Sequence, residues 1–283
     1  MNSQRKIPVG IYEKAFPADY SLEQILGSAS EIGYDFVELS IDESPERLQR
    51  LDWSKSERAA LRQVIGDTGI PFWGMGVSAH RKYPLGSTSP EVRQRGLDIF
   101  SQSIELAVDL GLRVIQVMGY DVFYEPSTPD TEANFLEGLK IGEKWASAAG
   151  VMLALENIDH ETVDSVEKAM RFVKELDSPW FNVYPDIGNL AAFGYDPIKQ
   201  LPLAEGHLVG VHVKDTRPGE VRGVLLEKGI VPFQDSFQLL SRMGFSGPIV
   251  MELWAHLDPT GDPFTTAAQA LATLDKWIDD AWG

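Results

Sequence analysis

The segment ASEIGYDFVEL, residues 29–39, joins the end of an amphipathic helix to a short apolar run through Gly33. Glycine at this place accepts the left-handed backbone conformation that closes a helix. The same unit returns with Gly69 before residues 71–73, Gly111 before 114–117, Gly150 before 152–155 and Gly244 before 249–251. This repetition predicts βα units that follow one another along the chain.

The apolar runs number eight, and we expect strands at 8–12, 36–41, 72–78, 114–119, 152–158, 181–186, 208–214 and 249–254. Helix starts between them are indicated by N-cap patterns at Ser21/Gln24, Ser54/Glu57, Asp164/Glu167 and Asp235/Gln238, and by proline in Ser89-Pro90 and Asp196-Pro197. A last helix is expected from about Phe264 to Trp282. The longest irregular stretches, 80–88, 120–129 and 217–232, all follow strands.

Eight strands alternating with helices predict an α/β fold, a closed (β/α)8 TIM barrel built as a single domain over residues 1–283. The alternative is an open doubly wound sheet. Such a sheet normally has a glycine-rich phosphate loop after an early strand, and the sequence contains none. In a barrel, the loops that follow the strands lie on the face where chemistry happens.

Composition limits the classes of partner. A net charge of −17 repels nucleic-acid phosphates and anionic lipid surfaces, so neither nucleic acid nor membrane is expected as a partner. The absence of cysteine excludes disulfides and thiolate metal sites. Residues 1–8 contain no apolar run of signal-peptide length, and no segment is apolar enough to span a membrane. We therefore expect a cytoplasmic protein.

Four consecutive predicted strands deliver a metal-ligand residue type at their carboxyl ends: Glu156, Asp186, His212 and Glu252. Any one of them could equally be a solvated strand end or an ion-pair partner. An unpaired carboxylate at the rim of an apolar barrel is costly, whereas three carboxylates and an imidazole around a divalent ion offset one another's charge. The set predicts one divalent metal ion. Mn²⁺ is favoured, and Mg²⁺, Co²⁺ or Zn²⁺ would also suit these ligands.

Such an ion would polarise the carbonyl of a ketose and stabilise the enediolate that forms when a neighbouring proton leaves. Glu156 and Glu252 come from separate strands and could face opposite sides of this planar intermediate. One carboxylate would then remove a proton and the other would return it, which inverts the carbon. The pattern does not decide which of the two is the base.

Several segments match a known family: GIYEKA (10–15), DFVE (35–38), SAHR (78–81), PLGS (84–87), RVIQ (113–116), GYDV (119–122), YPDIGNL (184–190) and VHVKDT (211–216). They resemble the L-ribulose-5-phosphate (L-xylulose-5-phosphate) 3-epimerases of the xylose-isomerase-like barrel superfamily, over residues 8 to about 254. The resemblance implies an isomerase of carbohydrate metabolism that epimerises a pentulose 5-phosphate at C3 through a cis-enediolate. It implies Glu156, Asp186, His212 and Glu252 as metal ligands, with Glu156 and Glu252 as the acid/base pair.

The resemblance also implies substrate contacts by Glu38, His80, Gln116, Asn189 and Lys214. Segment 227–233, EKGIVPF, departs from the family, whose members often have a Gly-Glu-Gly run followed by an acidic residue and Phe. Lys228 replaces the middle glutamate and Pro232 the acidic residue, which leaves the phosphate requirement open.

Two further residues, Arg81 and Trp254, are candidates for substrate binding, and the position of Glu38 allows several roles. Arg81 lies in the cluster His80-Arg81-Lys82, which could bind a substrate phosphate through the planar guanidinium or could be a solvated loop. Glu38 could hydrogen-bond a substrate hydroxyl, orient a ligand or pair with a neighbouring base. Trp254 is placed to form an apolar wall for a sugar.

Other functions remain open. The same site could epimerise unphosphorylated ketoses or act as an aldose-ketose isomerase, which usually needs a second metal. A DNA-repair endonuclease of the same superfamily would carry a histidine where Asn189 stands, and the acidic surface opposes DNA. A barrel that only binds sugar is the non-catalytic alternative. The expected ligand is a small sugar or sugar phosphate, and a homo-oligomer is expected, with a dimer favoured.

Overall fold

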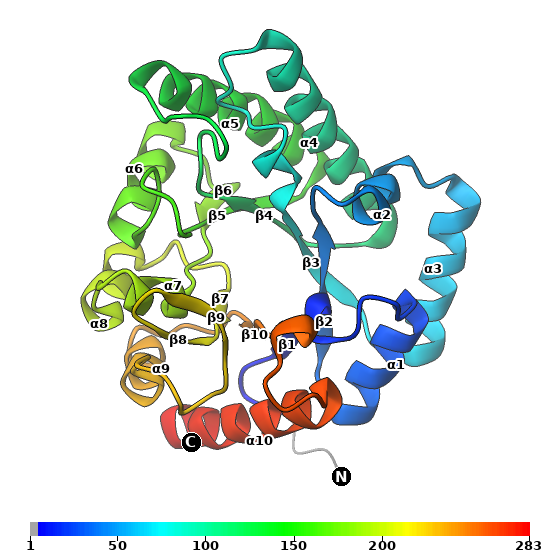
Figure 1. Ribbon diagram of the computed structural model, residues 1–283, viewed down its shortest axis with the longest axis vertical. Coiled ribbons are helices and arrows are strands. Elements are labelled where there is room, and N and C mark those ends of the chain that lie inside the picture. Colours follow the sequence, from blue (N-terminus) through cyan, green and yellow to red (C-terminus); the bar gives the residue numbers. More distant parts are fainter. Residues whose placement is uncertain (1–4) are drawn as a thin grey trace.

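The computed structural model describes residues 5–283, in which eight parallel strands form one curled sheet surrounded by helices (Figure 1). Around the sheet the strands follow the order β6-β5-β4-β3-β2-β1-β10-β7. Parallel bridges from Val183 to Leu208 and from Asp186 to His212 join its two ends and close the ring. The predicted (β/α)8 TIM barrel is confirmed. The predicted domain and the N-terminal segment 1–8 both include residues 1–4, which lie outside the described residues.

All eight predicted strands are present, and most end earlier than predicted. Their bounds are β1 Val9–Tyr12, β2 Phe36–Ile41, β3 Phe72–Val77, β4 Val114–Met118, β5 Met152–Glu156, β6 Phe181–Val183, β7 Val211–Val213 and β10 Ile249–Met251. β6 stops before Pro185, which has no N–H to donate to the sheet, and Asp186 then caps the next helix. The strands are short because the chain turns into the loops of the barrel mouth.

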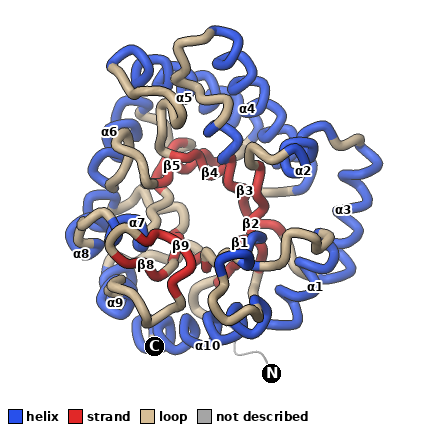
Figure 2. The backbone as a smooth tube through the Cα atoms, in the orientation of Figure 1, coloured by secondary structure: helices blue, strands red, loops and turns tan. Residues whose placement is uncertain are grey.

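Ten α-helices lie outside the strands among the described residues (Figure 2). They are α1 Leu22–Ile32, α2 Pro45–Leu48, α3 Lys55–Thr68, α4 Pro90–Leu110, α5 Pro129–Ala149, α6 Val166–Leu176, α7 Ile187–Ala192, α8 Pro197–Gln200, α9 Phe233–Arg242 and α10 Pro263–Trp282. Short 3-10 helices cover η1 Glu13–Ala15, η2 Gln49–Asp52, η3 Ser78–Arg81, η4 Leu201–Ala204 and η5 Ala255–Leu257. α10 packs against both α9 and α1, so the last helix closes the outer layer. None of the helices within residues 5–283 is long and apolar enough to cross a membrane.

The predicted helix starts are confirmed in four of six places. Ser21 and Ser54 form capping boxes, and Ser89-Pro90 and Asp196-Pro197 begin α4 and α8. The prediction at Asp164 is wrong by one residue, because the Ser165 hydroxyl accepts the hydrogen bond from the N–H of Lys168. The prediction at Asp235 is also wrong: α9 already begins at Phe233, so Asp235 lies in its first turn.

The stretch from 217 to 232 was expected to be irregular, but its first part forms a β-hairpin. β8 (Asp215–Arg217) and β9 (Glu220–Val224) form a two-stranded antiparallel sheet directly after β7. The turn between them contains Gly219, whose φ of 77° favours glycine. Figure 1 places this hairpin at the barrel mouth, on the side opposite β3.

Alternation along the strands sorts side chains between two layers. Leu153 and Leu155 of β5 belong to the large core between sheet and helices, whereas Ala154 belongs to a small cluster inside the barrel with Phe36 and Tyr184. Because successive side chains point to opposite faces of a strand, Glu156 follows Ala154 into the barrel interior, one step nearer the mouth. The alternation of side chains along each strand thus places the polar residues at the strand ends next to an apolar cluster inside the barrel.

Candidate metal centre and substrate pocket

Three carboxylate side chains and one imidazole lie close together inside the barrel mouth. Glu156 is the last residue of β5, Asp186 is the N-cap of α7, His212 lies in β7 and Glu252 directly follows β10. One ligand atom from each residue lies within 4.8 Å of the other three, and all four residues are buried. The structure therefore brings together all four residues that the sequence singled out as metal ligands.

The chemistry of this donor set fits one divalent cation. Three carboxylates and one imidazole supply oxygen and nitrogen ligands, which suit Mn²⁺, Mg²⁺, Co²⁺ and Zn²⁺. Asp186 is held in place by Asn157, whose side-chain amide accepts from the backbone N–H of Asp186 and donates to its carbonyl, both at 3.0 Å. Asn157 was not singled out from the sequence, because a side chain that hydrogen-bonds the backbone of a distant residue produces no recognisable sequence motif.

The ring of His212 is oriented by Glu38, on the far side from the cluster. Nε2 of His212 lies 2.7 Å from Oε2 of Glu38, and Nδ1 lies 3.2 Å from Oε1 of Glu156. The Tyr184 hydroxyl donates to Oε1 of Glu38 at 3.0 Å, and Gly210 leaves room for the Tyr184 ring, since a Cβ there would come within 2.3 Å of it. A carboxylate on Nε2 keeps the proton on that nitrogen and leaves Nδ1 free to bind a metal.

Electrostatics of the cluster depend on two cations. Burial disfavours the charged His212 imidazolium, but Glu38 and Glu156 outweigh it and raise the pKa of His212 well above its ordinary value. The Lys214 ammonium lies 2.7 Å from both Oδ2 of Asp186 and Oε2 of Glu252, and these carboxylates raise its pKa against the opposing effect of burial. His212 and Lys214 thereby compensate part of the negative charge of the three carboxylates.

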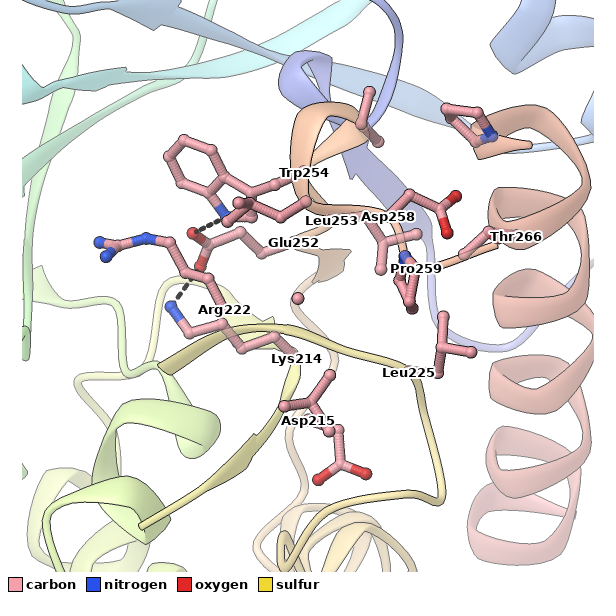
Figure 3. Close-up of a pocket in the computed structure, with 16 residues that line it drawn as sticks. Lys214, Asp215, Arg222, Leu225, Glu252, Leu253, Trp254, Asp258, Pro259 and Thr266 are labelled. Atoms are coloured by element: carbon pink, nitrogen blue, oxygen red, sulfur yellow. Dashed lines mark hydrogen bonds and ion pairs between the residues drawn. The ribbon is translucent and has the colours of Figure 1, made fainter. Parts of the chain in front are cut away.

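The two glutamates differ in proton affinity. Burial raises the pKa of Glu156 to about 7. Burial acts in the same direction on Glu252, but Lys214, His212 and Arg222 together outweigh it and hold the pKa of Glu252 below its ordinary value. Trp254 Nε1 donates to Oε1 of Glu252 at 2.9 Å while Lys214 holds Oε2, so both oxygens are fixed (Figure 3). A pair of carboxylates with separated pKa values is an arrangement suited to acid/base work.

An open pocket of about 520 Å³ lies over the cluster and is lined by Glu156, His212 and Glu252. The predicted substrate-binding residues Arg81, Gln116, Asn189, Lys214 and Trp254 also line it. A neighbouring pocket of about 400 Å³ lies between β9 and the loop after β10 and shares Lys214, Arg222, Glu252 and Trp254 with the first (Figure 3). Of these two pockets, only the first includes Glu156 and His212.

Two of the residues predicted to contact substrate do not line this pocket. Glu38 is fully buried behind His212 and orients it, which is one of the roles considered for it. His80 points away from the mouth: η3 turns its ring onto α4, where Nε2 lies 3.1 Å from the carbonyl of Gly96 and the ring packs edge-on against Phe100. Burial lowers the pKa of His80 to about 4, so its ring is neutral near pH 7. His80 is therefore not among the residues that line this pocket, and its contact with substrate stays a prediction.

Two basic residues of the pocket were missed by sequence reasoning. Lys14, in η1, lies 4.9 Å from the centre of the Trp254 ring, and Arg222, in β9, lies 5.1 Å from it on the hairpin. The only signal for Arg222 was the Pro218-Gly219 pair, which is typical of a turn and could have indicated a hairpin. Lys14 left no signal beyond its place just after the first strand.

Replacing Glu38 with Gln is expected to weaken divalent-metal affinity by about 10- to 100-fold, because the ring of His212 loses the carboxylate that fixes its tautomer. Competition with a chromogenic chelator measures this. Glu43→Gln is the matched control, since Glu43 receives a hydrogen bond from Tyr124 and touches no residue of the cluster. Unchanged affinity in Glu38→Gln would mean that His212 needs no such partner.

Comparison with known proteins agrees with the geometry. The family model described as xylose isomerase-like TIM barrel matches residues 26–277. Two L-ribulose-5-phosphate 3-epimerases named UlaE are close in sequence. That of Salmonella heidelberg (strain SL476) is 45% identical over 252 residues, 89% of each chain. That of Escherichia coli O139:H28 is 44% identical over 266 residues, 94% of this chain and 93% of the other.

Solved structures give the same fold. An L-ribulose 3-epimerase superimposes with a TM-score of 0.82 at 21% identity, covering 97% of this chain and 95% of the other. A D-allulose 3-epimerase from Methylomonas sp. gives a TM-score of 0.81 at 17% identity, with 96% and 97% covered. At these identities the likeness concerns the fold alone. The family match and the UlaE relatives carry the assignment: this chain belongs to the xylose isomerase-like TIM barrel family and, within it, to the epimerases, which are isomerases.

Proposed function

We propose that the protein is a metal-dependent 3-epimerase that interconverts L-ribulose 5-phosphate and L-xylulose 5-phosphate. The observation that carries this proposal is the approach of two glutamates to one imidazole nitrogen inside the substrate pocket. Glu156 Oε1 lies 3.2 Å and Glu252 Oε2 lies 3.6 Å from Nδ1 of His212. The names of the UlaE relatives support the pentulose phosphate.

In the proposed reaction one glutamate takes the proton from C3, and the electron pair of the C–H bond forms the C2=C3 double bond of a cis-enediolate. The π electron pair of the C2 carbonyl moves onto its oxygen at the same time. The other glutamate, as its carboxylic acid, then donates a proton to C3 from the opposite face. The substrate loses one proton and gains one, so its composition does not change while C3 is inverted. In the reverse direction the two glutamates exchange roles.

Glu156, Asp186, His212 and Glu252 would hold the divalent cation, which supplies Lewis-acid stabilisation of the negative charge that develops on the substrate oxygens. The chain itself orients the reacting groups. Trp254 and Lys214 fix the two oxygens of Glu252, and Asn157 fixes the backbone of Asp186. Such pre-positioning lowers the cost of bringing a carboxylate within reach of C3. A homodimeric assembly and a cytoplasmic location are part of the same proposal.

The test is a screen of C3-epimeric ketose pairs, with and without phosphate, in deuterium oxide with enzyme stripped of metal and reloaded with Mn²⁺. We expect conversion of L-ribulose 5-phosphate with deuterium incorporated at C3 of both epimers. Conversion of the free ketose alone would favour the epimerase of unphosphorylated sugars. Formation of an aldose with deuterium at C2 would indicate an aldose-ketose isomerase, and no incorporation at all would indicate a sugar-binding barrel.

A further inference from the structure

Asp121 lies in the loop after β4, within the motif GYDV (119–122), which the proposed acid/base chemistry does not use. Its side chain is fully buried. Among residues 5–283 its carboxylate has no lysine or arginine partner, and Nδ1 of His160 lies 3.9 Å from Oδ1. A buried carboxylate is costly unless a close cation or hydrogen bonds compensate its charge. Hydrogen bonds must therefore carry the compensation at Asp121.

Three hydroxyl groups donate these hydrogen bonds. Ser127 donates to Oδ2 of Asp121 at 2.7 Å together with Thr131, and Thr162 donates to Oδ1 at 2.6 Å. Burial alone would raise the pKa of Asp121, but the three hydroxyls outweigh it and hold the pKa below its ordinary value. An asparagine at this place would offer one accepting oxygen and an NH₂ group, so it could not accept all three bonds in the same way. The arrangement is therefore specific for a carboxylate.

The hydroxyls come from two segments that lie differently with respect to the substrate pocket. Ser127 and Thr131 lie at the start of α5 and do not line the pocket. Thr162 belongs to the loop after β5, segment 158–163, which lines the pocket through Ile158 and Asp159. The carboxylate of Asp121 thus ties a pocket-lining loop to a helix start outside the pocket.

Segment 158–163 contains no helix or strand, so its conformation depends on such ties. The N–H of Ile158 donates to the carbonyl of Val163 at 2.9 Å and joins the two ends of the segment. Thr162 then holds the segment against the loop after β4, which is the neighbouring strand in the sheet. Without this bond the segment would sample more conformations, and a bound sugar would have to order it.

Glu156 is fixed independently of this segment. Asn157, the next residue, holds the backbone of Asp186 through two hydrogen bonds. The side-chain amide of Asn189 in turn donates to the carbonyl of Asn157 at 3.0 Å. A change in segment 158–163 should therefore alter the pocket wall and leave the carboxylate of Glu156 in place.

We propose that Asp121 is a positioning residue that fixes segment 158–163, through Thr162, as the wall of the substrate pocket beside Glu156. Its effect on substrate binding rests on the proposed epimerase function. Asp121 does not touch the reacting atoms, so it acts on KM through the order of this wall. The link between Asp121 and Thr131 has no such effect, because α5 does not line the pocket.

The experiment compares Thr162→Val with Thr131→Val in the metal-loaded enzyme. Each substitution removes one hydroxyl from Asp121 and keeps the shape of the side chain. We expect Thr162→Val to raise KM for L-ribulose 5-phosphate by about 3- to 10-fold, the equivalent of one lost hydrogen bond, with kcat changed less than about 3-fold. Thr131→Val should leave KM within about 2-fold of wild type, although it should lower the urea midpoint at least as much, since Thr131 also accepts from the N–H of Thr128. Thr162→Ser, which keeps the hydroxyl, should restore the wild-type KM.

Hydrogen exchange of the backbone amides, followed by mass spectrometry without substrate, tests the same link without turnover. Thr162→Val should exchange faster in segment 158–163, Thr131→Val should exchange faster near 127–131, and Asp121→Asn should do both. If wild type epimerises no ketose, the proposed function fails, and faster exchange confined to 158–163 in Thr162→Val still supports the positioning role. Equal rises in KM in the two valine variants, an unchanged KM in Thr162→Val, or unchanged exchange in 158–163 would overturn it. Thr162→Ala repeats the test if Thr162→Val does not fold.

Discussion

Glu156→Gln and Glu252→Gln are each expected to lower kcat for epimerisation by about 10²- to 10⁴-fold, the usual contribution of one positioned acid or base. Glutamine keeps the shape of glutamate and can still offer an oxygen to a metal, but it cannot accept the C3 proton. The double variant should be little worse than either single variant, because inversion needs both carboxylates and they act as a unit.

Hydrogen exchange distinguishes the two glutamates. In deuterium oxide, each single variant should still exchange the C3 proton of the epimer that faces the remaining carboxylate, without converting it to the other epimer. Glu156→Gln and Glu252→Gln should therefore label opposite epimers, which assigns each carboxylate to one face of the sugar. Glu43→Gln, which removes a carboxylate at the mouth that touches neither glutamate, should keep wild-type kcat. An unchanged kcat in either active-site variant would exclude that residue from proton transfer.

Removal of the metal by a chelator is expected to reduce epimerisation to background, and added Mn²⁺ should restore it. Metal bound only by the folded protein should also increase the free energy of unfolding, by about 2.7 kcal/mol at a free concentration 100 times the Kd. Urea unfolding of the stripped and reloaded protein measures this difference. The reason is that the four ligand atoms converge only when the barrel has closed.

The same measurements of activity and unfolding, with and without metal, can be made on the variant Asp186→Asn. Asp186 is both a candidate ligand and the N-cap of α7, where its Oδ1 accepts from the N–H of Asn189. Asparagine caps a helix as well as aspartate does, so the variant should fold but lose most of the metal-dependent activity and stabilisation. Asp196→Asn changes the matching cap of α8, outside the pocket, and should keep both. Full activity of the chelated wild type would refute the metal requirement.

The sequence alone determined the barrel and the convergence of the four candidate ligands, for a local reason. A glycine-closed helix followed by an apolar run is readable over about ten residues, and eight such units have few ways to bury their strands. Strand ends of a parallel barrel meet at one rim, and the period of two along a strand decides which side chains point inward. Glu156, Asp186, His212 and Glu252 could therefore be placed together without any knowledge of their distances.

Only the tertiary structure decided which neighbouring side chains contact these four candidate ligands. Glu38 reaches His212 across 174 positions of the chain, and Tyr184 reaches Glu38 across 146, so neither contact leaves a local pattern. The turn of η3 sends His80 to α4 and Arg81 to the pocket, although the two are adjacent in sequence. Arg222 enters the pocket because the hairpin folds over the mouth. Side-chain direction in loops depends on what the closed barrel packs against them, and that information is spread over the whole chain.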